Sequence, residues 1–179
     1  MVIELIFAAL ILATSTLSSE QHEAAPKIAI PRLPPTAFPE LPQSVVRGLT
    51  KRGCTIPQAY LQTAPHNVIR GSFARNDQTD WAILCSAGGV TRILVFWKGS
   101  DETVSALAST NDDITQENGR YLRAILPVSS DRIKSYHDAF GGPKPPPIDH
   151  EGIDDCLGEK VSYVRYFYAG KWLKLTGAD

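Results

Sequence analysis

The chain has 179 residues, a length that suits one globular domain with additional segments. Its 18 Lys and Arg residues nearly balance its 19 Asp and Glu residues, so the formal net charge is −1. This balance argues against a nucleic-acid-binding protein, which needs a concentrated basic face.

The N-terminal sequence is typical of an export signal. Residues 5–13 (LIFAALILA) are nine consecutive apolar residues, and the small and polar run TSTLSS follows them. Nine residues are too few to cross a bilayer, which takes about 20. We therefore predict a signal peptide at 1–19 and a periplasmic or secreted protein, with no transmembrane span in the mature chain. An uncleaved anchor and a buried core segment are the alternatives, because the starting run MVIE has no Lys or Arg.

The next segment is rich in proline. Residues 20–42 contain six of the 13 prolines of the chain, which is incompatible with a helix or a central strand. The sequence predicts an extended linker at 20–41 and a single globular α+β domain at 42–179.

The first half of this domain predicts one helix and four strands. The run LPQSVVRGLTKRG has an apolar pair at Val45 and Leu49 and a glycine stop at Gly53, as in a short helix. Turn-forming segments separate four apolar runs that read as an antiparallel meander. These runs are Val68–Phe73, Trp81–Ser86, Thr91–Trp97 and Glu102–Ala108.

The second half predicts a strand at Tyr121–Val128 and a helix that begins after Ser129 or Ser130 and stops at Gly141. A proline-rich loop follows, and residues 160–175 predict a hairpin that turns at Ala169–Gly170. We expect an α+β fold with a blade-like, four-stranded antiparallel β-meander, two short helices and a C-terminal β-hairpin. A single sheet with both helices on one face is the preferred arrangement.

The chain has three cysteines, Cys54, Cys85 and Cys156. In an oxidising compartment two of them pair. Cys54 follows the first predicted helix and Cys85 lies in a predicted core strand, so we predict the bridge Cys54–Cys85. Three free thiols are the alternative.

The run GSFARNDQTDWAIL resembles the FG-GAP or VCBS repeat, which reads roughly G-D-F-N-G-D-G-x-x-D-[LW]-A-V. The resemblance covers residues 68–100 and implies a blade-like meander and a calcium loop. Its calcium ligands fall on Ser72, Ala74, Asn76 and Asp80, with Asp77 as a substitute. Since calcium takes six to eight oxygens and Ala74 offers none from its side chain, we expect no calcium at Asn76, Asp77 and Asp80 and no other cofactor. Asp80 is instead expected to hydrogen-bond the turn, with Phe73 packed inward.

The densest polar cluster is IDHEGIDDC at 148–156. It contains Asp149, His150, Glu151, Asp154 and Asp155, groups that could hold a divalent cation or serve as acid and base. The spacing matches no known metal motif, so a solvated loop that leads into a helical turn is the preferred interpretation.

Aromatic residues concentrate in the last hairpin. Tyr166, Tyr168 and Trp172 are candidates for a face that binds a glycan or a protein. No catalytic motif accompanies them, so we expect a non-enzymatic binding domain of the cell envelope or exterior, with an envelope protein or glycan as partner. A small hydrolase or metal-dependent enzyme that uses the 149–155 cluster is the first alternative, and a glycan-binding domain is the second.

Overall fold

The computed structural model describes residues 30–159 and 161–178. The predicted signal peptide at 1–19 and the first part of the predicted linker, residues 20–29, lie outside the described residues.

The first four long strands form an antiparallel meander, as the sequence predicts. Each strand pairs with the next one along the chain. The strands are β3 (Val68–Gly71), β4 (Asp80–Ala87), β5 (Val90–Phe96) and β6 (Val104–Asn111). The apolar run of β5 is buried on both faces, because β5 lies inside the sheet with a packed layer on each side.

The last four long strands form a second antiparallel sheet in the order β12-β11-β10-β9. They are β9 (Arg123–Val128), β10 (Gly152–Leu157), β11 (Val161–Tyr168) and β12 (Lys171–Thr176). The hairpin turns at Ala169–Gly170, as predicted, and both residues have positive φ angles of 49° and 79°, which a type I′ turn requires. The expected single sheet is wrong, because β10 joins β9 to the hairpin and completes a separate sheet.

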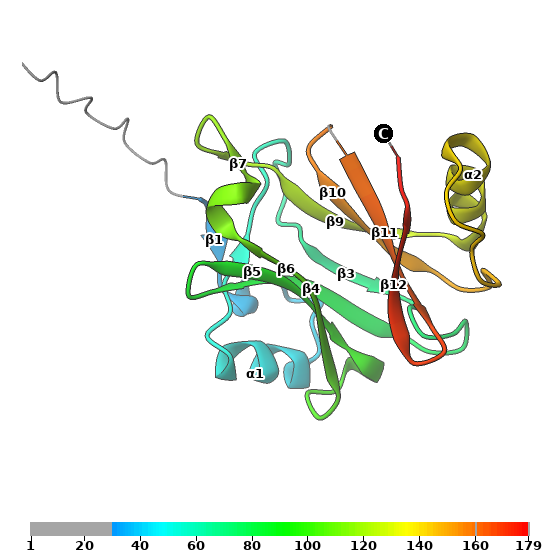
Figure 1. Ribbon diagram of the computed structural model, residues 1–179. Coiled ribbons are helices and arrows are strands. Elements are labelled where there is room, and N and C mark those ends of the chain that lie inside the picture. The colour runs from blue at the N-terminus through cyan, green and yellow to red at the C-terminus, as the bar shows by residue number, and fades with distance from the viewer. Residues whose placement is uncertain (1–29, 160, 179) are drawn as a thin grey trace, which may run out of the picture.

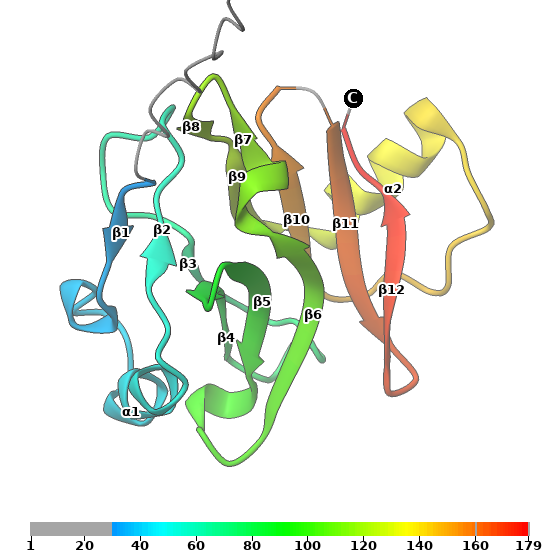
Figure 2. The same ribbon diagram turned by 60° about the vertical axis from the view of Figure 1, so that its left-hand side comes forward.

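The two α-helices cover opposite outer faces of the stacked sheets (Figures 1 and 2). Helix α1 (Gln43–Lys51) packs Val45 and Leu49 on the first sheet, and α2 (Ser130–Phe140) packs Ile133 and Tyr136 on the second. A third apolar cluster fills the space between the sheets. The expectation that both helices share one face is therefore wrong, since each covers the sheet formed by its own half of the chain.

Residues 30–41, which the sequence assigns to the linker, belong to the folded domain. Strand β1 (Arg32–Leu33) pairs with β2 (Ile56–Pro57), and the 3-10 helix η1 (Pro35–Ala37) follows β1. Phe38 and Leu41 are buried in the cluster beneath α1. The predicted domain boundary at residue 42 is wrong because these two apolar side chains complete that core.

The predicted disulfide Cys54–Cys85 is confirmed. Its Cα atoms are 5.2 Å apart, and the bridge joins the segment after α1 to strand β4. Cys156, in β10, is a free thiol.

Four short elements complete the described fold. The 3-10 helix η2 (Trp97–Gly99) follows β5, η3 (Asp112–Thr115) follows β6, and β7 (Gln116–Glu117) pairs with β8 (Arg120–Tyr121).

Candidate functional site

The first part of the predicted polar cluster lies in the loop before β10. His150 is buried there, and its ring stacks on Tyr166 with 4.3 Å between the ring centroids. Its Nδ1 is 2.9 Å from the carbonyl oxygen of Glu151, and its Nε2 is 3.0 Å from that of Phe167. Both ring nitrogens therefore contact the backbone rather than a neighbouring acidic side chain at hydrogen-bonding distance.

The two acids beside His150 connect this loop to the segment between β3 and β4. Glu151 Oε2 accepts a hydrogen bond from the backbone N–H of Ser72 at 2.8 Å, and the carbonyl oxygen of Asp149 accepts one from Asn76 Nδ2 at 2.6 Å. The Asp149 side chain is 77% exposed and accepts the hydroxyl of Tyr166. The structure thus brings together the loop that resembles a calcium repeat and the predicted polar cluster. The hydrogen bonds between them each use a backbone group, and they hold the two loops together.

The other two acids of the cluster, Asp154 and Asp155, lie within β10. The interpretation of this stretch as a solvated loop and helical turn is wrong. Asp155 is 7% exposed and accepts hydrogen bonds from two arginines, Arg123 at 2.8 and 3.2 Å and Arg165 at 3.2 and 2.9 Å. These two cations allow a carboxylate to enter an interior strand.

Asp154 faces the opposite side of β10, because successive side chains of a strand alternate. Cys156 shares the face of Asp154. Burial, with a smaller contribution from Asp154, raises the pKa of the Cys156 thiol to about 12. The five members of the cluster therefore do not share one site: His150 Nε2 and Asp149 Oδ1 lie 3.9 Å apart, whereas Glu151 bonds to Ser72, and Asp154 and Asp155 face opposite sides of β10.

The loop that resembles a calcium repeat is held by one carboxylate. Asp80 is fully buried, and its Oδ2 accepts the backbone N–H groups of Phe73 and Ala74 at 3.2 Å each. Its Oδ1 accepts Gln78 Nε2 at 2.7 Å and the N–H of Lys98 at 2.9 Å. The predicted turn-bonding role of Asp80 and the inward packing of Phe73 are confirmed.

The other residues considered as calcium ligands have separate contacts. Asp77 pairs with Arg75 at the surface at 2.7 Å, and Asn76 donates to the loop before β10. In the described residues, no three His, Cys, Asp or Glu side chains are grouped closely enough to hold a metal ion.

The predicted aromatic face is divided between two sides of the second sheet. Tyr166 is fully buried beneath α2, whereas Tyr168 is 42% exposed. Trp172 lies on the other side of the sheet and stacks on Trp97 at 5.7 Å, with Phe167 at 5.4 Å. The three candidates therefore do not form one face, because Trp172 is directly opposite Phe167 rather than Tyr166.

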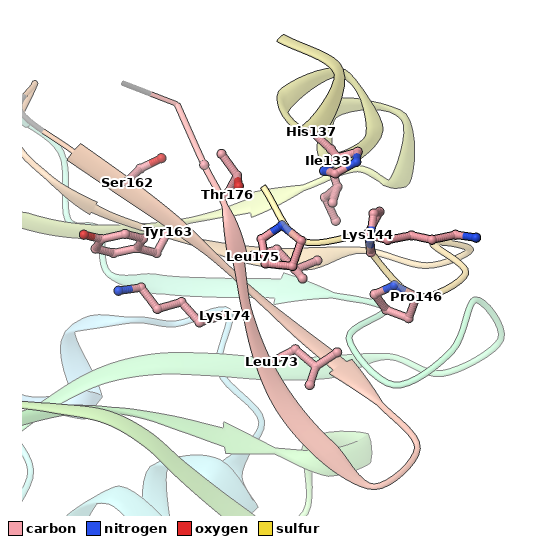
Figure 3. Close-up of a pocket in the computed structure, with 13 residues that line it drawn as sticks. Ile133, His137, Lys144, Pro146, Ser162, Tyr163, Leu173, Lys174, Leu175 and Thr176 are labelled. Atoms are coloured by element: carbon pink, nitrogen blue, oxygen red, sulfur yellow. The ribbon is translucent and has the colours of Figure 1, made fainter. Parts of the chain in front are cut away.

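A groove that the sequence analysis missed lies between α2, the proline-rich loop 143–146 and β12 (Figure 3). Its volume is about 450 Å³. Ile133 from α2 and Leu173 and Leu175 from β12 supply apolar walls, together with three prolines of the loop. The alternation of leucine and lysine in KWLKL and the prolines of GGPKPPP were the available signals, but neither one shows that the two segments adjoin.

The groove carries positive charge at its edges. Lys144 and Lys174 line it along with His137, and none of the described lining residues is an Asp or Glu. The Nζ atom of Lys174 lies 3.4 Å from the centroid of the Tyr163 ring. This arrangement favours a ligand with apolar side chains and a negative charge.

One wall of the groove is the open edge of a sheet. Among the described strands, β12 pairs only with β11. Every second residue of such an edge strand directs its N–H and C=O groups away from its neighbour. The wall thus offers main-chain donors and acceptors beside apolar pockets.

Comparisons of the chain with protein families, with curated proteins and with solved structures found no match. In the part of the chain that the structure describes, no helix is long and apolar enough to span a membrane.

Proposed function

We propose that the protein is an exported, non-enzymatic binding domain that captures an extended segment of a partner protein in the groove beside β12. The observation that carries the proposal is the position of this apolar groove, about 450 Å³ in volume, against an open strand edge.

The edge of β12 supports binding by strand addition. An extended peptide adds to a sheet edge through main-chain hydrogen bonds, and alternate side chains enter neighbouring pockets. Leu173 and Leu175 have the same parity on β12, so both face the α2 side of the sheet. Side chains of an added strand would pack against them and against Ile133.

The charges of the groove indicate the composition of the segment. Lys144 and Lys174 have no carboxylate beside them among the described lining residues. A segment that alternates apolar residues with Asp or Glu would match both the leucines and the lysines.

Two observations support export. The first is the apolar N-terminal run at 5–13, which lies outside the described residues. The second is the disulfide Cys54–Cys85, since stable disulfides are characteristic of oxidising compartments. The enzymatic alternative has weaker support, because the described side chains of the 149–155 cluster bring only Asp149 near His150, at 3.9 Å, and hold no group of three metal-ligating side chains.

A peptide-display selection against the purified protein tests the proposal. We expect extended acidic and apolar peptides, and we expect Leu173→Gln to weaken their binding about tenfold, as the loss of one buried leucine contact predicts. Leu126→Gln is the matched control, because Leu126 is 50% exposed on β9 outside the groove.

Hydrogen exchange supplies a second measurement. Bound peptide should slow exchange of the β12 amides, because strand addition pairs those facing outward. Failure to select any peptide, or equal weakening by Leu173→Gln and Leu126→Gln, would contradict the proposed function.

A further inference from the structure

A second pocket, about 140 Å³ in volume, opens between β6 of the first sheet and β10 and β11 of the second. Its polar lining comes from Thr110, Arg123, Asp155, Tyr163 and Arg165. This pocket lies beside the buried ion pairs, and of its lining residues only Tyr163 also lines the groove.

The face of the second sheet that carries this pocket has more cations than carboxylates. Strand register places Arg123, Arg165 and Lys174 on the same side as Asp155. Within the described strands β6 and β9–β12, Asp155 is the only acidic side chain directed between the sheets, since Asp154 faces α2.

Two of these cations are direct neighbours. Arg165 and Lys174 are opposite one another in the pairing of β11 with β12, an arrangement that is destabilising for like charges. Both also lie over the ring of Tyr163, at 5.9 and 3.4 Å from its centroid. A negative charge between them would compensate the repulsion.

The two arginines differ in how many of their donors are used. All five N–H groups of Arg123 have partners: both oxygens of Asp155, the hydroxyl of Thr110, and the carbonyl oxygens of Thr91 and Ala108. Arg165 uses only two, both toward Asp155 Oδ2.

The remaining N–H groups of Arg165, including both on Nη1, have no hydrogen-bond partner within the described part of the chain, although this side chain is only 19% exposed. A guanidinium in a mostly buried side chain whose donors the protein leaves unused is suited to bind an acceptor from outside.

We propose that this pocket binds a small organic carboxylate. The carboxylate accepts hydrogen bonds from the free donors of Arg165, which match the planar geometry of such a group. Its hydrocarbon tail packs against Leu157 and Val161, the apolar lining of the pocket. The apolar walls favour a carboxylate with a short tail over inorganic phosphate, which has no apolar part.

The thiol of Cys156 does not oppose an anion. The residue borders the pocket, but its side chain lies on the α2 face of β10 with Asp154, and burial raises its pKa to about 12. The carboxylate site does not depend on the peptide groove, and either proposal can fail alone.

Isothermal titration calorimetry with acetate, butyrate and inorganic phosphate at neutral pH tests the assignment. We expect one site per chain, tighter binding of butyrate than of acetate, and the weakest binding for phosphate. Absence of carboxylate binding at millimolar concentration, or tighter binding of phosphate than of butyrate, would overturn the proposal.

Three variants locate the site. Arg165→Lys keeps the charge beside Asp155 but removes the planar fork, and it should weaken butyrate binding at least tenfold. Lys174→Gln should weaken it severalfold. Lys171→Gln is the control, because Lys171 has the opposite parity on the same strand and pairs with Tyr168, whereas Lys174 is directly opposite Arg165. If Arg165→Lys fails to fold, the comparison of butyrate affinity between Lys174→Gln and Lys171→Gln tests the site instead. Equal butyrate affinities for those two variants would refute the site.

Discussion

Replacing Asp80 with Asn should destabilise the protein strongly, although the two side chains have almost the same shape. The carboxylate of Asp80 is fully buried and accepts four hydrogen bonds, three of them from backbone N–H groups. An amide has one oxygen and one NH₂ group. The NH₂ group of the substituted side chain would therefore face N–H groups that need an acceptor.

The size of the loss follows from these contacts. If the NH₂ group replaces Oδ1, Gln78 can turn its own amide to adapt, but the N–H of Lys98 loses its acceptor. A buried donor without a partner costs about 1–3 kcal/mol, and the two bonds from the Phe73 and Ala74 N–H groups each lose about 1 kcal/mol because their acceptor becomes neutral. We expect the free energy of unfolding to fall by about 3–5 kcal/mol.

Urea denaturation, followed by far-UV circular dichroism, measures this loss. Asp77→Asn is the matched control in the same loop, and it should change the free energy of unfolding by less than about 0.5 kcal/mol because Asp77 forms only an exposed ion pair. Both measurements are made with calcium and with a chelator.

The result should be the same in both solutions, since N–H groups already occupy both oxygens of Asp80. A loss below about 1 kcal/mol for Asp80→Asn would refute the reasoning about the buried acceptor. An increase in wild-type stability with calcium that Asp80→Asn abolishes would show that the loop is a calcium site.

Two further predictions concern the cysteines. Replacing Cys54 and Cys85 together with Ala should lower the free energy of unfolding by about 3–4 kcal/mol in urea denaturation, because the bridge closes a loop over a sequence separation of 31 residues; a loss below about 1 kcal/mol would contradict this. For Cys156, whose pKa is raised to about 12, stability should fall as pH rises from about 9 towards 12, since the unfolded thiol releases its proton first. Cys156→Ala should remove that part of the pH dependence, and identical pH profiles for the two proteins would show that the thiol is not buried as described.

Local patterns in the sequence predicted the elements whose residues interact mainly with near neighbours. The helix after Pro42, the four-strand meander and the hairpin at Ala169–Gly170 depend on apolar periodicity and turn residues, and all three are present. The disulfide could also be predicted, because a helix end and a core strand were already identified on either side of it.

The strand β10 could not be predicted in this way. In the sequence, its run GIDDC resembles an exposed acidic loop. It forms an interior strand because Asp155 is paired with two arginines, one of which is 32 residues away in the chain. The groove was missed for a similar reason, since α2, the proline-rich loop and β12 adjoin only after β10 has completed the second sheet.

The sequence by itself therefore determined the local elements, the disulfide and the hydrogen-bonding role of Asp80, because each depends on side chains close in the chain or on a strong apolar pattern. Only the tertiary structure decided that there are two sheets, that Asp155 is buried, and that Tyr166 and Trp172 lie on opposite faces. Those outcomes depend on which distant strands pair, and pairing fixes which charges are neutralised and which edge remains open.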